Sequence, residues 1–555
     1  MSRALTPKTT VDLLRREAKR WLKALRASDP AAAARLRAAW PDAPPEPGLR
    51  DLQHALALEY GQESWAALRA ALADLTLARL SQDERADQLL AHGWDGDPVA
   101  AARLLRRNPE LARFSLFTAA ACGDLGEVER RMAGDPLAAT RTGGPQAWTA
   151  LAHVAYGRLD GENALEIARR LLDAGADPNF QFDDAWGSPF KVVTGAIRLG
   201  EGARPSHPQA LELADLLIEA GANPYDSQAL YDVSIVGEDT YWYDVLWRRS
   251  EARGALDGWR IPGPERLGGA RGLSTLDYLL GNAVGQNHLV RAEWLLQRGA
   301  HADALHLYNR QPVHALAQLS GFHDIAALLE RWGATPGQLA GVQALQAACM
   351  TGDEAEARSL VAADPSLLHD PAPLLSAAEL GNARAVEILL ALGAAATAVG
   401  HDGISPLHRA VQSGCLEAVK MLLAAGADVD LRETRWRGTP LSWAVVLRRP
   451  QIAEYLAPLG HDVRALANLG LKARLEAVLA ERPGLAKEIL PAEDGPTPLF
   501  CLPDDEIMAV EIARILLEHG ADPAARNAKG QTAIDLARDF DLEDAAVLME
   551  GWGAR

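Results

Sequence analysis

Few residues in this chain have the types and spacing that a catalytic or metal site requires. The sequence contains none of the patterns HExxH, GxxxxGK[ST] or GxSxG, and the segment most similar to a phosphate-binding loop, 527–532, lacks the leading glycine. The four cysteines, Cys122, Cys349, Cys415 and Cys501, lie far apart and form no CxxC pair. We therefore predict no catalytic residue, no metal site and no cofactor.

The histidines do not change this prediction. His314 and His408 each stand two residues after a proline, at the same place in two copies of a recurring motif. A histidine at that place can bond to nearby backbone, so we interpret both as structural. His401 and His461 lie in predicted turns, and neither has a second ligand at metal-site spacing.

The side chains best suited to recognition are aromatic and charged residues in short segments between predicted helices. Segment 432–437 is basic and carries one Trp, segment 180–186 is acidic and carries three aromatic residues, and segment 226–273 contains clustered Tyr and Trp. Trp, Tyr and Arg dominate the hot spots of protein interfaces. The alternative is that these rings pack on neighbouring repeats, and 226–273 is then a diverged repeat that buries its aromatics. The candidate partner-binding residues are Phe182, Trp186, Tyr241, Trp242, Arg432, Arg435, Trp436 and Arg437.

The segments that carry these candidates connect copies of one structural unit. One copy opens at Ser405-Pro406-Leu407-His408, and the next opens 34 residues later at Thr439-Pro440. A serine suits a helix N-cap, and a proline suits the first helical position, where no backbone donor is needed. The unit therefore begins with a helix whose first turn is specified by its own residues.

The second helix of the unit is amphipathic. Ala418, Val419, Leu422 and Leu423 fall on one helical face, and residues 426–428 (Gly-Ala-Asp) end the helix. A single unit of this size cannot cover its own apolar face, so several units must stack on one another. The sequence therefore predicts a solenoid rather than a globular enzyme core.

The unit resembles the ankyrin repeat, which has a period of about 33 residues. This resemblance extends over most of the chain and implies an all-α solenoid of helix-turn-helix units with short finger loops. It also implies that partner proteins bind to the finger tips and to the concave face of the first helices. Further copies of the closing motif occupy residues 171–179, 216–224, 295–300, 328–334, 389–394 and 516–523.

A second, shorter type of unit ends in proline instead of Gly-Ala-Asp. Such units end at Asp135-Pro136, Asp364-Pro365 and Arg482-Pro483, and residues 97–109 are similar. Proline cannot continue a helix. We therefore predict that these units still stack on their neighbours but lack a regular finger.

Two stretches interrupt the repeat register and define the predicted organisation. Residues 200–208 are expected to be a short loop insertion, and 226–273 contains no clean repeat. Inserts in repeat proteins lie on one face, which is often the binding face. We predict a helical N-terminal leader over 1–80, repeats over 81–340 with an insert at 226–273, and repeats over 341–555.

The leader differs from the rest of the chain in charge. Residues 1–41 carry ten Lys and Arg against three Asp and Glu, a net charge of +7 within a chain of net charge −18. Apolar residues line one face of a predicted helix, and the leader is similar to segments found ahead of ankyrin arrays in bacterial proteins. The preferred interpretation is a cap over the first repeat. The alternatives are contact with an anionic membrane surface or with an acidic partner.

Composition limits the partners and the compartment. The negative net charge argues against nucleic acid, because phosphate contacts need clustered Lys and Arg. Residues 1–10 hold no apolar signal core, and no run of about 18 apolar residues predicts a transmembrane segment. The sparse, unpaired cysteines fit a reducing cytosol, so a cytoplasmic protein is expected.

These observations predict a non-catalytic scaffold or adaptor that binds a protein partner of unknown identity. Two alternatives stay open. One is a secreted bacterial effector that uses the same surface, and the other is an enzyme with a site in 226–273.

Overall fold

The chain is described by a computed structural model, whose contacts form two compact units. One unit contains Arg79–Gln338, and the other contains Met1–Ala78 together with Leu339–Arg555. The described residues are 3–6, 9–45, 47–77, 79–95, 97–159, 163–184, 187–198, 200, 205–489, 497–540 and 542–553. The candidate Trp186 and part of the predicted insertion at 200–208 lie outside these ranges.

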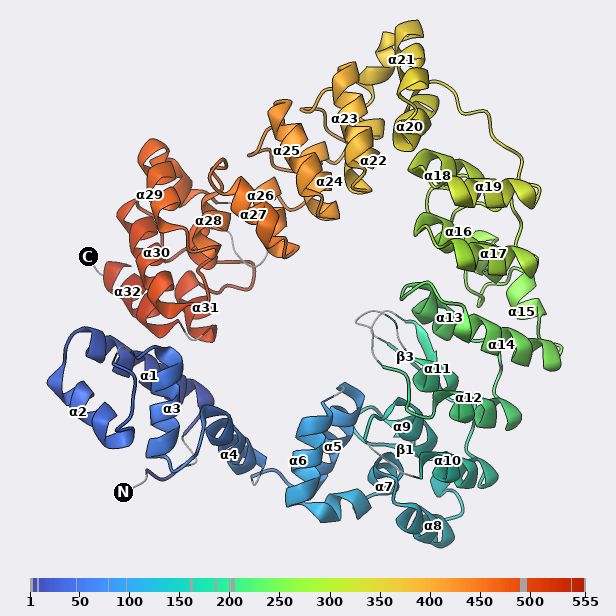
Figure 1. The fold of residues 1–555 in the computed structure, drawn as a ribbon. Coiled ribbons are helices and arrows are strands. Elements are labelled where there is room, and N and C mark those ends of the chain that lie inside the picture. The colour runs from blue at the N-terminus through green and yellow to red at the C-terminus, as the bar shows by residue number, and fades with distance from the viewer. Residues whose placement is uncertain are drawn as a thin grey trace. The chain divides into compact units, whose positions relative to one another are not determined.

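The unit Arg79–Gln338 is a series of short helices and two small hairpins (Figure 1). Its helices are α5 (Gln82–Asp95), α6 (Pro98–Arg107), α7 (Leu116–Cys122), α8 (Leu125–Gly134), α9 (Ala150–Tyr156), α10 (Ala164–Asp173), α11 (Val192–Ile197), α12 (Ala210–Glu219), α13 (Ser227–Ser234), α14 (Tyr241–Ala252), α15 (Asp257–Arg260), α16 (Thr275–Gly285), α17 (Leu289–Gln297), α18 (Val313–Ser320) and α19 (His323–Arg331). Its strands are β1 (Thr142–Gly143), β2 (Trp148–Thr149), β3 (Gln181–Asp183) and β4 (Pro189–Lys191).

The other unit combines the leader with the C-terminal repeats. The leader helices are α1 (Val11–Arg26), α2 (Pro30–Ala39), α3 (Leu49–Glu59) and α4 (Trp65–Leu77). The repeat helices are α20 (Val342–Thr351), α21 (Glu354–Ala363), α22 (Ala372–Glu379), α23 (Ala383–Leu392), α24 (Pro406–Ser413), α25 (Leu416–Ala424), α26 (Pro440–Val446), α27 (Pro450–Leu456), α28 (Val463–Asn468), α29 (Lys472–Glu481), α30 (Glu506–Glu518), α31 (Ala533–Asp539) and α32 (Glu543–Gly553).

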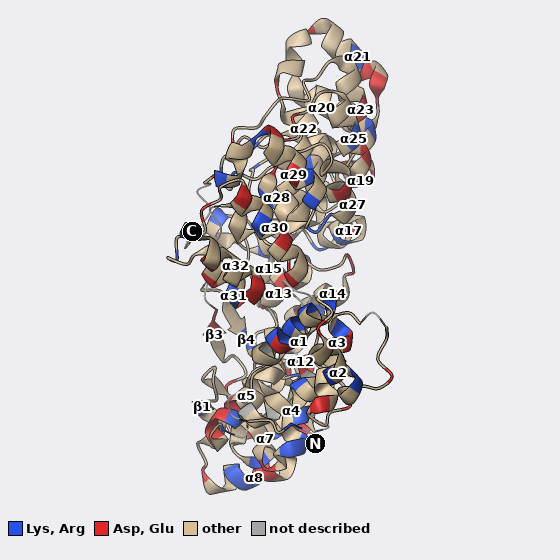
Figure 2. Cartoon of the chain, turned by 90° about the vertical axis from the view of Figure 1, so that its left-hand side faces the viewer, with Lys and Arg blue, Asp and Glu red and all other residues tan. Residues whose placement is uncertain are grey.

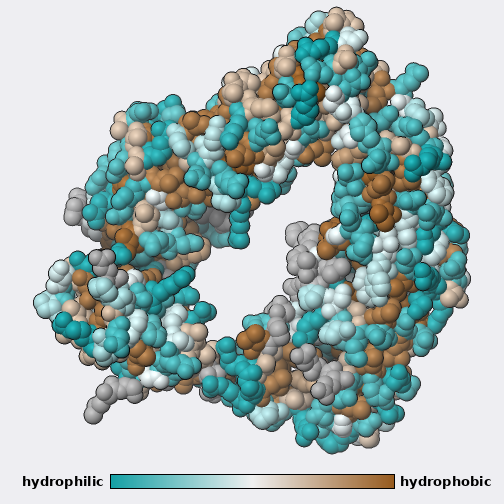
Figure 3. All heavy atoms as spheres, in the orientation of Figure 1, coloured by the Kyte–Doolittle hydropathy of each residue, from teal (hydrophilic) through white to brown (hydrophobic). Residues whose placement is uncertain are grey.

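Within each unit, successive helices pair and the pairs stack side by side. The first helices α7, α9, α11 and α13 contact one another in turn, as do α20, α22, α24, α26 and α28. The second helices α21, α23, α25 and α27 form a parallel row. The predicted all-α solenoid is therefore confirmed. On the face shown in Figure 3, hydrophilic residues cover most of the surface and hydrophobic residues form smaller patches.

The pair α24 and α25 shows how the sequence specifies a unit. Ser405 caps α24 by accepting from the His408 N–H, and Gly414 ends the helix in the left-handed conformation, with φ of 81°. Leu422 is fully buried, as predicted, whereas Leu423 is only half-buried. The apolar face that stacks against neighbouring units is thus narrower than the sequence suggests.

The shorter units end as their prolines require. Pro109, Pro365 and Pro483 each open a 3₁₀ helix directly after the second helix of the unit, in the segments Pro109–Arg113, Pro365–His369 and Pro483–Lys487. The antiparallel hairpin of β3 and β4 follows the regular unit α9–α10, but the antiparallel hairpin of β1 and β2 follows the proline-terminated unit α7–α8, after Pro136 and the 3₁₀ turn Ala138–Thr140. The prediction that proline-terminated units lack a finger therefore agrees with the structure after Pro109 and Pro365, and it is wrong for α7–α8, which a hairpin follows.

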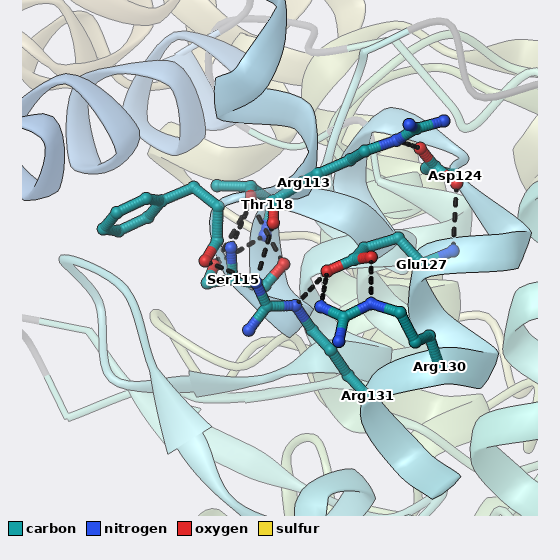
Figure 4. Close-up of polar contacts among 8 residues, drawn as sticks. Arg113, Ser115, Thr118, Asp124, Glu127, Arg130 and Arg131 are labelled. Atoms are coloured by element: carbon teal, nitrogen blue, oxygen red, sulfur yellow. Dashed lines mark hydrogen bonds and ion pairs between the residues drawn. The ribbon is translucent and has the colours of Figure 1, made fainter. Parts of the chain in front are cut away.

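An arginine and carboxylate network stabilises the short unit formed by α7 and α8 (Figure 4). The Glu127 carboxylate accepts from Arg130 Nε at 2.7 Å and from Arg131 Nε at 2.7 Å. Arg131 also donates to the backbone carbonyls of Arg113 and Phe114, which connects α8 to the preceding turn. The hydrogen bond from Arg130, reinforced by Arg131, lowers the pKa of Glu127 from 4.5 to about 2 against the opposing effect of burial.

Glu127→Gln is expected to reduce the acid sensitivity of this unit. Because the pKa of Glu127 is lower in the folded state, its carboxylate stabilises the fold fully above pH 4.5 and loses this effect as the pH falls toward about 2. Hydrogen-exchange protection factors of the α7 and α8 amides should therefore fall more from pH 7 to pH 3 in the wild type than in the variant. Glu129→Gln, at a half-exposed position paired with Arg170, is the matched control. An equal acid response in the wild type and Glu127→Gln would contradict the assignment.

The insert 226–273 folds as a diverged helix pair with a buried aromatic core. Tyr243, Trp247 and Trp259 are buried, and the rings of Trp247 and Trp259 meet edge to face at 5.4 Å. Helix α13 replaces the first helix of a regular unit, and α14 replaces the second. The interpretation of this segment as a diverged repeat that buries its aromatics therefore agrees with the structure.

A buried arginine ties this insert to the next repeat. Arg291 on α17 is 1% exposed and donates to the backbone carbonyls of Val233, Ser234, Val236 and Asp239 at 2.9 to 3.1 Å. Val233 and Ser234 belong to the last turn of α13, where backbone carbonyls have no partner within the helix. The positive guanidinium also complements the negative end of the α13 dipole.

The leader has a core of its own. Leu14, Ala18, Trp21 and Leu22 of α1 are buried with Leu52 and other residues of α3, as the helical pattern in the sequence predicts. The indole of Trp21 donates to the Ala32 carbonyl at 3.0 Å, which fixes α2 against α1. The leader is therefore a small helical cluster rather than a single amphipathic helix.

Candidate protein-interaction site

The finger between α25 and α26 is held by a buried carboxylate. Glu433 is fully buried, and its carboxylate accepts from the backbone N–H groups of Arg435, Trp436 and Gly438 at 2.6 to 2.9 Å. Hydrogen bonds of this kind to a charged acceptor are about twice as strong as those between neutral groups. The backbone of the finger tip is thus fixed from within.

Further hydrogen bonds and an ion pair hold the same finger. The Thr434 N–H donates to the Asp402 carbonyl of the preceding finger at 3.0 Å. Arg432 donates to the Arg437 carbonyl at 3.0 Å and pairs with Glu488 at 2.9 Å. The conformation of residues 432–438 is therefore set before any partner binds.

This rigid finger presents an exposed tryptophan. The Trp436 side chain is 60% exposed, and only its edge meets the ring of Trp443, at 6.4 Å between centroids. The guanidinium of Arg435 lies 4.7 Å from the Trp436 ring, and Arg437 is exposed beside it. In the described part of the chain, no carboxylate pairs with Arg437. The aromatic ring and this cation are both available to a partner.

A hollow of about 700 Å³ lies beside the finger, and we refer to it as the finger groove. Its apolar wall comes from α26 and its ends, where Val446 is 78% exposed and Leu447 and Trp443 add further apolar surface. Its rim is basic. The rim arginines are Arg409, Arg432, Arg437 and Arg464.

The acidic side chains at and around the groove already have partners within the protein. Asp462 is buried and accepts from the Thr439 hydroxyl, while Glu379 and Glu488 pair with the rim residues Arg409 and Arg432. An apolar wall with a cationic rim suits a ligand segment that combines an apolar side chain with carboxylates.

His408 and Cys501 lie near the groove, and burial shifts the pKa of each toward its neutral form. Burial lowers the pKa of His408, whose ring bonds to Ser405 and lies 3.1 Å from the Gly438 carbonyl, so the structural interpretation of this histidine agrees with its contacts. Burial raises the pKa of the Cys501 thiol at the edge of the groove. A neutral thiol is a poor nucleophile.

Two cysteines outside the groove, Cys122 and Cys349, are also poor nucleophiles. Burial raises the pKa values of Cys122 and Cys349 to about 12. Among the residues that the structure describes, no cluster of His, Cys, Asp or Glu has the grouping that a metal ion needs. The described helices also include none that is long and apolar enough to span a bilayer.

Three further candidates that the structure describes, Phe182, Tyr241 and Trp242, belong to the other compact unit, Arg79–Gln338. Phe182 on β3 is half-buried, and its ring stacks on Trp148 at 4.6 Å and on Phe190 at 5.7 Å. Trp242 is buried, so it packs in the core instead of facing a partner, whereas Tyr241 is half-exposed at the start of α14. The candidates Arg432, Arg435, Trp436 and Arg437 lie together on one finger.

Sequence reasoning missed the contribution of α26 to the groove. Val446 and Leu447 end α26, where a regular amphipathic helix would place polar residues on the exposed side. Two large apolar residues next to the Arg448-Arg449 pair at a helix end are the signal that could have revealed this wall.

Comparison with known proteins agrees with this architecture. A family model for ankyrin repeats in three copies matches residues 345–433 and 374–467. The chain is an ankyrin repeat protein. It is 34% identical over 139 residues to ankyrin repeat and SOCS box protein 11 of Danio rerio, a match that covers 25% of this chain and 38% of that protein.

Two further relatives define how far the similarity extends. The chain is 51% identical over 62 residues to protein phosphatase 1 regulatory subunit 27 of Mus musculus, covering 11% of this chain and 39% of that protein. It is 26% identical over 201 residues to the putative ankyrin repeat protein YahD of Escherichia coli (strain K12), covering 34% of this chain and all of that protein. The chain thus spans well under half the length of the first two relatives.

Proposed function

We propose that this ankyrin repeat protein is a non-catalytic scaffold or adaptor that binds a partner protein at the finger groove. The observation that carries the proposal is Trp436, an exposed ring on a finger whose backbone is fixed by the buried Glu433 carboxylate. A ring that is already held in place loses little conformational freedom on binding, which leaves more of the contact energy for affinity.

The partner is proposed to present an acidic segment with an apolar anchor. The chain is acidic overall, with a net charge of −18, so the segment 432–437, with three arginines and one glutamate, is a local reversal of sign. Such a patch attracts acidic segments and raises their association rate. The apolar wall of Val446 and Leu447 would receive the anchor side chain.

The non-catalytic role is supported by the chemistry of the described residues. Burial raises the pKa values of Cys122 and Cys349 to about 12, and Tyr243, Trp247 and Trp259 of 226–273 are used in packing. A cytoplasmic location is proposed from the cysteine usage alone. The same groove would also serve an exported effector, and a secretion assay in the source organism separates the two roles.

The double substitution Trp436→Ala/Arg437→Ala should abolish most partner capture without unfolding the repeats. We expect the binding constant of the partner to weaken at least about tenfold, or about 1.4 kcal/mol. Because both side chains are exposed, stability should change by no more than about 0.5 kcal/mol. Quantitative affinity capture from an extract of the source organism, with circular dichroism of both proteins, provides the measurement.

The matched control is Tyr308→Ala, which removes a 72% exposed ring from the other compact unit, Arg79–Gln338. A partner that depends on the finger groove should bind this control as it binds the wild type. Early melting of the double variant would make Trp436 a packing residue. A folded double variant that captures every partner at the wild-type level would contradict the proposal.

A further inference from the structure

The leader contacts the last repeats of its own unit through one basic helix face. On α1, Lys19 Nζ lies 3.1 Å from Glu506, Lys23 Nζ lies 3.3 Å from Asp544, and Arg16 lies 3.7 Å from Glu543. Positions 16, 19 and 23 share one side of a helix, because residues three and four apart are neighbours on its surface. Figure 2 shows Lys and Arg gathered along α1.

The acidic side of this contact is organised around Glu506. This carboxylate is almost fully buried, and it accepts from the backbone N–H groups of Asp544 and Ala545 at 2.5 and 3.2 Å. Those donors belong to the first turn of α32, whose N-terminus favours negative charge. The other oxygen of Glu506 accepts from Lys19, so one carboxylate joins α30, α32 and the leader.

The contact is ionic rather than a continuation of the core. The buried residues of the leader and those of the C-terminal repeats form two separate clusters. A cavity of about 490 Å³ lies between them, with Leu22 on the leader side and Ile507 and Val510 on the repeat side. Lys19, Lys23, Glu506 and Asp544 line this hollow, so the ion pairs rather than close apolar packing hold the two sides together.

We propose that the leader is a reversible clasp, whose basic α1 face docks on the acidic face formed by the starts of α30 and α32. The occupant of that acidic face is the chain's own leader, because the charges are complementary and the three ion pairs already join them. The clasp shields the end of the last repeats, where terminal repeats of a solenoid need a polar cover. It is independent of the finger groove and does not rest on the function proposed for that groove.

The contact with the last repeats was not expected from the sequence. The sequence predicts a cap over the first repeat, whereas these ion pairs join the leader to 339–555, with which it shares a compact unit. The physical reason is electrostatic, since Glu506, Glu543 and Asp544 gather carboxylates where two helices begin. The basic α1 face is therefore occupied, which argues against the membrane-surface alternative while the clasp is closed.

A zero-length carbodiimide, which joins a lysine amine to a carboxylate in contact with it, tests the clasp on the full chain. We expect a link between Lys23 and Asp544 at low salt, identified by mass spectrometry of the digested monomer. Its yield should fall at least about fivefold near 0.5 M salt, where the Debye length is only about 4 Å. The link between Lys472 and Glu511, whose charged atoms lie 2.7 Å apart within the repeats, is the internal reference.

Two variants separate the clasp from a general effect of charge. Lys19→Glu places a carboxylate against buried Glu506 and should lower the Lys23–Asp544 link at least about fivefold at low salt. Arg37→Glu changes an exposed leader cation outside this contact and should leave the link unchanged. If Lys19→Glu fails to fold, the salt dependence of the Lys23–Asp544 link in the wild type still tests the clasp.

Three results would overturn the clasp. One is the absence of the Lys23–Asp544 link while the Lys472–Glu511 reference forms. The second is a yield that neither salt nor Lys19→Glu lowers relative to the reference. The third is a link that joins two different copies, shown by mixing isotope-labelled and unlabelled protein, since the leader would then dock on a second molecule.

Discussion

Leu422→Ala is expected to destabilise the repeats around α24–α27 by about 2–5 kcal/mol. Leu422 is fully buried in the stack, among Ala418, Val419 and residues of the neighbouring pairs, so the truncated side chain leaves a cavity. In a solenoid, units couple to their neighbours, so the loss should appear as an extra step in denaturant unfolding and as faster hydrogen exchange in these helices.

Leu423→Ala is the control for this prediction. It removes the same atoms from the adjacent, half-buried position, so its cost should be clearly smaller. Equal effects of the two substitutions, or an unfolding curve for Leu422→Ala that overlays the wild type, would mean that the buried face of α25 is misassigned.

Arg291→Met should destabilise the region of the diverged repeat by at least about 3 kcal/mol, because it leaves four buried or half-buried carbonyls without their donor. Methionine keeps most of the aliphatic volume, so the expected loss comes from the hydrogen bonds rather than from a cavity. The guanidinium also lies 5.2 Å from the Tyr243 ring, and that contact is lost as well.

The destabilisation caused by Arg291→Met should be confined to the helices around the diverged repeat. Hydrogen exchange should accelerate in α13, α14 and α17 and much less in α7–α10, measured on the full chain by mass spectrometry. Arg248→Met, at an exposed position of α14, is the matched control and should change stability by no more than about 0.5 kcal/mol. Unchanged protection of α13 in Arg291→Met would show that these carbonyls do not depend on the arginine.

The repeat architecture was predictable because its signals are local. Ser405 and Thr439 cap helices that begin at the next residue. Gly414 ends the helix capped by Ser405, eight residues after that helix begins at Pro406. Such signals depend on spacing within one unit, which the sequence displays directly. The same locality made the basic finger at 432–437 visible as a candidate before its geometry was known.

The errors concern contacts between distant parts of the chain. Phe182 looked like a finger-tip ligand, but the pairing of β3 with β4 stacks its ring on Phe190. Lys19 and Glu506 are separated by 487 residues, so no pattern within a repeat indicates that they meet. The buried role of Arg291 likewise depends on carbonyls more than fifty residues earlier in the chain.

Part of the finger groove was predictable from the sequence, and part of it was not. Its charge and its tryptophan are readable from six consecutive residues, whereas its apolar wall requires the placement of α26 beside the finger. The buried carboxylate of Glu433 was not recognised either, because an acidic residue in a basic segment suggests only a solvated charge. Preorganisation of the site is therefore a property that only the structure reveals.

The central claim, that the finger groove binds an acidic segment with an apolar anchor, is tested most directly by peptide selection against the full chain. Peptides selected from a random display library should combine Asp or Glu with an aromatic or aliphatic residue. Their affinity, measured by fluorescence anisotropy, should weaken at least about tenfold for Trp436→Ala/Arg437→Ala and remain unchanged for Tyr308→Ala. Selected peptides that lack acidic residues, or that bind the double variant as tightly as the wild type, would contradict the claim.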